Sequence, residues 1–186
     1  MPGRTPTEAY FQFIEPMQRA LNFIAVGRLL LSRPFGSSVG GRLIDTSFNE
    51  AEPAPIGGAN IGRLYLRAAC RCRIDTELST PRSYQCRLVG YSYGFLNAEG
   101  RNLLTFHWNS NATGAERSFP HLHIGAPVSS GSTLIPERLH KLHIPTGVIS
   151  VGALVRFAIE ELEIDVRPGM NRAGVLDELS RMIADQ

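Results

Sequence analysis

The clearest pattern in the chain is a strict alternation of apolar and polar positions between residues 64 and 75. A period of two is typical of a β-strand, because successive side chains point to opposite faces of a sheet. We therefore predict a strand with two different faces. One face is apolar and carries Leu64, Leu66, Ala68, Cys70, Cys72 and Ile74, and the other is rich in arginine, with Arg67, Arg71 and Arg73.

The stretch that follows predicts more strands. Residues 84–96 are rich in aromatic and β-branched side chains, and Gly90 and Gly94 within them indicate bulges or close backbone approaches. The polar sequence ending in Gly100 is typical of a hairpin turn. The expected order is therefore a strand at 84–96, a turn at 97–100, a returning strand at 101–108 and a short strand at 119–124.

Apolar residues at helical spacing predict helices at both ends of the chain. Residues 8–33 follow this spacing, with Thr7 as the cap, and Pro16 is expected to break them into two short helices. Ser150 can cap a second helical segment, and residues 172–184 form the last one.

These elements predict a single α+β domain spanning residues 1–186. Its centre is an antiparallel β-sheet of about 4–6 strands, with helices at the N-terminus and two at the C-terminus. Residues 34–60 are rich in Gly, Pro, Ser and Asn, which favours a loop with one edge strand at 42–44. The predicted parts are a helical segment at 7–33, the sheet at 61–124 and the C-terminal helices at 150–184.

Composition fits a cytoplasmic protein with an ordinary core. The 186 residues are 43% hydrophobic, and no secretory signal follows the first residues. The longest apolar run, 20–31, is well short of the roughly 20 residues of a membrane span. Three cysteines without a Cys-x-x-Cys spacing favour reduced, buried thiols over a disulfide framework or a metal site.

The net charge of +2 hides an uneven distribution. Residues 61–90 hold six arginines against two acids, and residues 151–186 hold four arginines against seven acids. A basic sheet can attract RNA, with Arg67, Arg71 and Arg73 on the phosphates and Tyr84, Tyr91 and Tyr93 stacked on the bases. The alternative is a solvated face, or one covered by the acidic terminal helix.

All five histidines fall between residues 107 and 143. His121 and His123 share one face of a predicted strand, and His107 joins them if the preceding strand is the neighbour. Three imidazoles on one face can hold zinc with an open fourth position, or act without metal as base and acid on a phosphodiester. Half-buried histidines of purely structural role are the alternative. His140 and His143 are expected to pack where the chain enters the next helix.

The segment from Tyr91 to the helix after Ser150 resembles the TumE-like toxins of bacterial toxin–antitoxin pairs. The resemblance covers about a third of the chain, and its most specific element is Phe-Pro-His-x-His at 119–123. The chain departs from the family where Ser110 to Thr113 replace Pro-His-His, and where Leu122 and Ile124 occupy positions open to further histidines. The other matching segments are Tyr91-Ser92-Tyr93, Asn97 to Gly100, and Leu103 to Asn109.

This resemblance implies a small toxin directed at RNA or translation and neutralised by a cognate antitoxin. Our leading hypothesis is a toxin-like or defence-associated protein with ribonuclease-type chemistry. His121 and His123 would be the acid/base pair or metal ligands, with His107 as third member and Arg71 or Arg73 as phosphate clamp. One alternative is a non-catalytic scaffolding subunit of a larger complex, which docks through its helices. Others are a structural zinc domain and a homo-oligomer.

Overall fold

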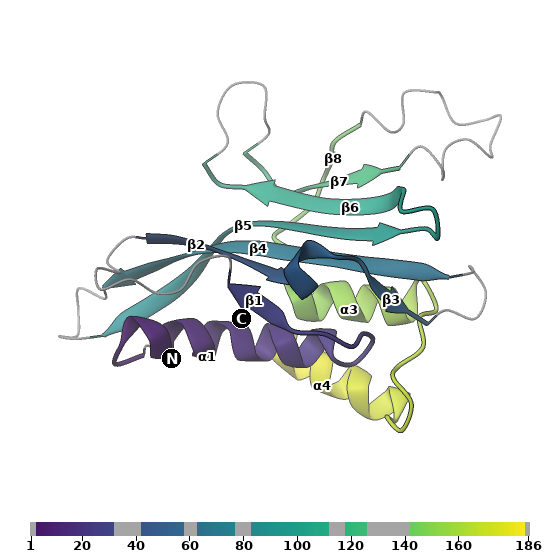
Figure 1. Cartoon of the computed structure of the whole chain (residues 1–186), viewed down its shortest axis with the longest axis horizontal. Coiled ribbons are helices and arrows are strands. Elements are labelled where there is room, and N and C mark those ends of the chain that lie inside the picture. The colour runs from purple at the N-terminus through teal and green to yellow at the C-terminus, as the bar shows by residue number, and fades with distance from the viewer. Residues whose placement is uncertain are drawn as a thin grey trace.

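The computed structural model describes residues 3–31, 42–57, 63–76, 83–111, 118–125 and 142–184. These residues form an antiparallel sheet of eight strands with helices packed on one side (Figure 1). The strands are β1 (Leu29–Leu31), β2 (Arg42–Phe48), β3 (Ala54–Ile56), β4 (Leu64–Thr76), β5 (Tyr84–Leu96), β6 (Asn102–Asn109), β7 (His121–Ile124) and β8 (Ile144–Pro145). The helices are α1 (Pro6–Leu21), the short η1 (Asn49–Ala51), α3 (Val151–Glu160) and α4 (Arg172–Ala184).

The α+β class and the antiparallel sheet are confirmed, but the sheet has more strands than the 4–6 expected. Its order is β1-β2-β4-β5-β6-β7-β8, and β3 pairs with β4 beside β2. The additional strands β1, β3 and β8 have only two or three residues each. Such short strands form by pairing with a longer neighbour, so they leave no periodic signal in the sequence.

Strand β4 has the two faces that its alternation predicts. Its apolar side chains are buried, and those of Arg67, Arg71 and Arg73 are exposed. The hairpin from β5 to β6 is also confirmed, with Gly100 in the left-handed region at φ 73°. The register of β4 and β5 shifts between Arg71 and Cys72, beside Gly90, which confirms the bulge predicted at this glycine. No register shift occurs at Gly94.

Helix α1 differs from the prediction in three ways. It runs unbroken through Pro16, its cap is Thr5, whose side chain accepts a hydrogen bond from the Glu8 N–H, and it ends at Leu21. Pro16 is exposed, so the carbonyl that loses its partner faces water, while the packing of the opposite side holds the helix together. Leu29–Leu31 pair with Thr46–Phe48 as an edge strand and do not continue the helix.

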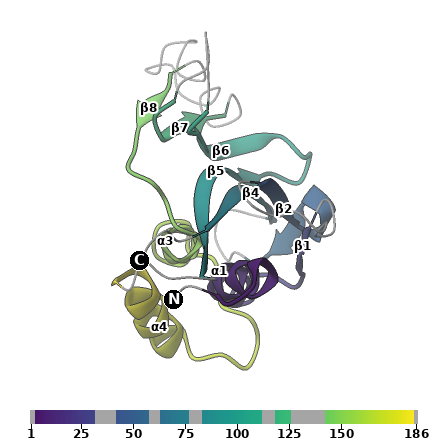
Figure 2. The same ribbon diagram turned by 90° about the vertical axis from the view of Figure 1, so that its left-hand side faces the viewer.

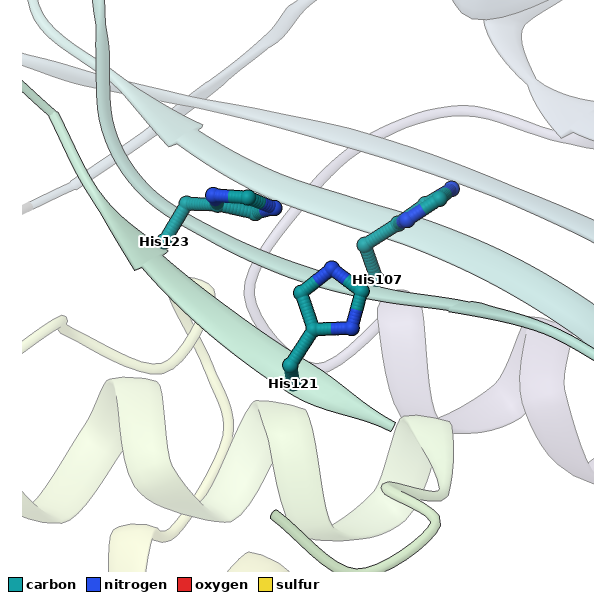
Figure 3. Close-up of side chains that lie close together, drawn as sticks. All are labelled: His107, His121 and His123. Carbon is teal, nitrogen blue, oxygen red and sulfur yellow. The ribbon is translucent and has the colours of Figure 1, made fainter. Parts of the chain in front are cut away.

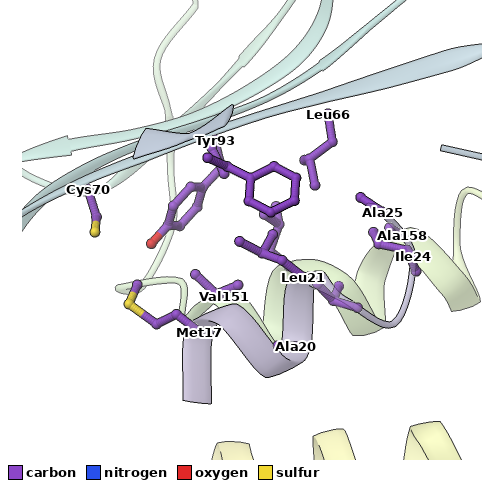
Figure 4. Close-up of a cluster of buried hydrophobic side chains, with 14 of the residues drawn as sticks. Met17, Ala20, Leu21, Ile24, Ala25, Leu66, Cys70, Tyr93, Val151 and Ala158 are labelled. Carbon is purple, nitrogen blue, oxygen red and sulfur yellow. The ribbon is translucent and has the colours of Figure 1, made fainter. Parts of the chain in front are cut away.

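The core lies between the sheet and the helices α1 and α3. Leu21 and Ala158 from these helices meet Leu66 and Tyr93 from the sheet (Figure 4). Helix α3 begins at the predicted cap, where Ser150 Oγ accepts from the Ala153 N–H at 3.2 Å. We call the side of the sheet that these helices cover the helix face. The opposite side, which carries Arg67, Arg71 and Arg73, is called the open face.

Helix α4 packs against α3, on the side away from the sheet (Figure 2). Glu178 of α4 forms an ion pair with Arg19 of α1. The acidic terminal helix therefore lies behind the helix layer and does not cover the arginines of the open face. In the described ranges, no helix is long and apolar enough to cross a membrane.

Candidate metal centre and the hollow beside it

Strands β6 and β7 bring three of the predicted site residues together. The two strands are neighbours, with His107 directly opposite His121 and Thr105 opposite His123. The three imidazole rings converge on the open face (Figure 3). One nitrogen from each lies within 4.8 Å of the other two, which is close enough for the group to bind a metal ion.

The distances suit a zinc-like cation after small side-chain rotations. Zinc binds imidazole nitrogen at about 2.0–2.1 Å, which places three tetrahedral nitrogens roughly 3.3 Å apart. The observed limit of 4.8 Å exceeds that spacing by an amount that rotation about the side-chain torsions can close. Three protein ligands leave one tetrahedral position for water or substrate.

His121 is held in the orientation that a metal ligand requires. Its side chain is 2% exposed, and its Nδ1 lies 2.8 Å from the carbonyl oxygen of Phe119. A carbonyl only accepts, so Nδ1 donates its proton there and Nε2 keeps its lone pair. Metal-binding histidines are commonly fixed by such a bond from the other ring nitrogen.

The environment of His123 favours a neutral ring. Burial lowers its pKa below the ordinary value of 6.5, and the neighbouring histidines His143, His121 and His107 lower it further. A neutral imidazole is the form that binds metal, whereas an acid/base pair needs one imidazolium. A neutral imidazole can also act as a general base, so the lowered pKa of His123 fits both the metal and the metal-free hypothesis.

A fourth histidine lies beside this group, contrary to the expectation of helix-entry packing. The ring of His143 is centred 4.5 Å from that of His123 and 4.9 Å from that of His121. Strand β8 pairs with β7, and the Thr146 N–H donates to the Pro120 carbonyl at 2.9 Å, which brings the segment back to the sheet. A two-residue strand gives no periodic signal. His140 lies outside the described residues.

A hollow of about 270 Å³ adjoins the histidine group on the open face. His107 lines it and so belongs to both, whereas His121 and His123 do not line it. Its lining comes from β2, β4, β5 and β6 and includes the small residues Ala69, Gly90 and Ser92. The other lining residues are Asp45, Thr46, Ser47, Cys70, Arg71, Tyr91, Trp108 and Asn109.

The arginines proposed for RNA binding differ in their surroundings. Arg71 lines the hollow and pairs with Asp45 through two hydrogen bonds, Nε to Oδ1 at 2.6 Å and Nη2 to Oδ2 at 3.1 Å. Arg73 pairs with Asp75 farther along β4, and Arg67 is exposed near the other end of the strand. Neither of these two lines the hollow.

The tyrosines proposed as base-stacking groups lie on the opposite side of the sheet. Tyr91 and Tyr93 stack on each other in the helix-face core, where they are 3% and 1% exposed. The Tyr91 hydroxyl accepts from the Ile149 N–H at 3.1 Å. Neither ring is on the surface that carries the arginines, so the two parts of the RNA hypothesis do not share a face.

The cysteines behave as apolar core residues, as expected for Cys70 and Cys72. Burial raises the pKa of Cys70 to about 12. The pKa of Cys86 is raised by its hydrogen bond with Cys72 and then by burial. Protonated thiols of this kind are poor metal ligands, because the thiolate is the form that binds.

Comparison of the chain with protein families, with curated proteins and with solved structures found no match.

Proposed function

We propose that the chain is a zinc-dependent hydrolase of RNA phosphodiester bonds, with His107, His121 and His123 as the metal ligands. The convergence of their three nitrogens within 4.8 Å carries this proposal. Zinc would activate water and polarise the phosphoryl oxygens. Each reaction consumes one water, whose oxygen bonds to phosphorus while the leaving oxygen departs and takes up a proton.

Two features support a hydrolytic site over a structural zinc site. A structural zinc has four protein ligands, and this group supplies three. The hollow is lined by His107, so a substrate bound there would contact one of the proposed ligands. The ring of His143 is centred 4.5 Å from that of His123, so zinc bound by all four histidines is the structural alternative, and the effect of His143→Gln on zinc binding separates the two.

The arginines of the open face and the resemblance to TumE-like toxins support RNA as the substrate in this proposal. The open face carries Arg67, Arg71 and Arg73, and α4 does not cover it. A toxin of this kind would act inside the bacterial cell and would have a cognate antitoxin as its partner.

The alternative of a scaffolding subunit docked through its helices gains less support. The large exposed apolar residues of the first helical region are Phe11, 58% exposed, and Val26, 69% exposed. Ten residues of helix separate Phe11 from the end of α1, which is about 15 Å. Apolar residues scattered in this way do not form a docking patch.

The first test is zinc binding by the purified protein, measured by competition with a chromophoric chelator. His107→Gln and His123→Gln are the useful variants, since both side chains are partly exposed, whereas loss of the buried His121 endangers folding. Loss of a residue that only hydrogen-bonds to a metal ligand weakens metal binding by about 10–100-fold. We expect each of these variants, which lacks a direct ligand, to weaken zinc binding by more than that. His143→Gln is the matched control and should have a smaller effect.

Activity is then followed on single-stranded RNA with equal amounts of zinc-loaded wild type and His107→Gln, purified in parallel. Cleavage that is lost in the variant and abolished by chelator is the expected result. Cleavage at equal rates in both would identify a contaminating nuclease. Zinc binding that is unchanged in His107→Gln and His123→Gln, with both variants folded, would contradict the proposed ligands.

A further inference from the structure

The hollow is lined by two chemically different groups on strands that are not neighbours. His107 of β6, one of the proposed metal ligands, lies on one side, and the Arg71–Asp45 pair of β4 and β2 lies on the other. Three strand spacings lie between β4 and β7, and with the offset along the strands the backbone of Arg71 is on the order of 15 Å from that of His121. A ligand that contacts both groups must therefore be extended and not a single phosphate.

Arg71 is prepared to bind an anion. Its guanidinium has five N–H groups, and among the residues that the structure describes Asp45 accepts from two of them, which leaves three to donate to a ligand. The side chain is 43% exposed, and the two bonds to Asp45 hold the plane of the guanidinium in one orientation. Arginine held in this way binds phosphate with good geometry, because two of its parallel N–H groups match two phosphate oxygens.

The middle of the hollow suits the rest of a nucleotide. Ala69 and Gly90 line it without bulk, and Ser47 and Ser92 are polar residues of its lining. Its volume of about 270 Å³ is close to the lower end of the about 300–1,000 Å³ that small-molecule sites occupy. A single nucleotide with polar edges is of this size.

We propose that the hollow is the subsite for the nucleotide next to the cleaved bond, with Arg71 binding the phosphate of that nucleotide. Asp45 is the positioning residue for the guanidinium. This assignment rests on the proposed function, because it names the substrate contacts of the same site. It predicts a preference for single strands at least two nucleotides long, since a mononucleotide reaches one of the two groups alone.

The test compares Arg71→Ala, Arg71→Lys and Arg87→Ala. Arg87 is the matched control: it is exposed, lies opposite Arg73 on β5, and donates two hydrogen bonds to Gln85 without lining the hollow. Binding of a fluorescent single-stranded RNA oligonucleotide is measured by anisotropy at several salt concentrations. The zinc-loaded proteins are also assayed for cleavage, with kcat and KM determined separately.

Arg71→Ala should weaken binding and raise KM by roughly tenfold or more, with kcat nearly unchanged. Its slope of log affinity against log salt should fall in magnitude by about 0.7, the value for one phosphate contact on a single strand. Arg71→Lys should retain part of the affinity, because lysine keeps the charge without the bidentate geometry. Arg87→Ala should leave affinity and slope unchanged.

Failure of this inference can be told apart from failure of the proposed function. Binding that depends on Arg71 and not on Arg87, without any cleavage, would support nucleotide binding in the hollow through Arg71 and refute the hydrolase. Equal loss of binding in Arg71→Ala and Arg87→Ala would overturn the subsite even if RNA is cleaved. Absence of RNA binding by the wild type would also overturn it.

Discussion

The two faces of strand β5 are built from opposite kinds of residue. On the helix face, Tyr91, Tyr93 and Phe95 are 3%, 1% and 0% exposed, and their rings fill the core against α1 and α3. On the open face, Gly90 and Ser92 are so small that a hollow remains beside His107. One strand therefore contributes to stability through one face and to a candidate site through the other.

This separation means that the two properties should respond to different substitutions. Large side chains on the helix face contribute through burial, which scales with apolar area. Small ones on the open face contribute through the space that they leave. Neighbouring residues of β5 therefore provide closely matched variants.

The largest expected effect comes from truncating the helix face. Phe95→Ala should lower the free energy of unfolding by about 3–5 kcal/mol, because it removes a fully buried ring that contacts Phe157. Ser92→Ala, on the exposed side of the same strand, should change it by less than about 0.5 kcal/mol. Urea unfolding of both variants measures the difference, and similar losses in the two would refute the division of faces.

A smaller effect is expected where the open face approaches the neighbouring strand. A Cβ at Gly90 would lie 2.9 Å from the Trp108 carbonyl oxygen, so Gly90→Ala should destabilise by about 1–3 kcal/mol. A Cβ at Gly94 would have its nearest contact at 3.6 Å, an ordinary distance. Gly94→Ala should therefore leave stability unchanged or raise it by up to about 1 kcal/mol. Thermal melts that rank the two variants the other way would contradict this account.

The smallest effect concerns pH and the histidine group without metal. The pKa of His123 in the fold is below 6.5, so the unfolded chain takes up its proton first as the pH falls. The free energy of unfolding should then decrease as the pH drops through about 6.5, and level off below the pKa of the folded form. His123→Gln should lack this part of the pH dependence in chelator-treated protein. Parallel stability curves for wild type and variant would show that His123 does not contribute.

Much of the fold follows from local patterns. The alternation in β4, the hairpin closed by Gly100, and the Ser150 cap each depend on neighbouring residues, so each could be predicted from the sequence. The break expected at Pro16 was wrong, because burial of residues such as Ile14 and Met17 holds α1 together. Local propensity gave way there to packing against the sheet.

The candidate site shows the same division. His121 and His123 share a face because they are two apart in a strand, and His107 joins them because β6 and β7 are neighbours. Nothing local places His143 beside them, since its position depends on the pairing of a two-residue strand. The sequence also did not predict that Tyr91 and Tyr93 point into the core under the helices, because both faces of β5 carry residues that are common in strands.

Side-chain periodicity along the chain was enough to predict the main antiparallel strands, the helices at both ends and the common face of His121 and His123. The folded structure was needed to learn which face of β5 the helices cover, where His143 lies and where the hollow forms. These depend on the strand order and on the volumes of residues distant in sequence. Pairing and packing energies between such residues leave no local periodicity from which to read them.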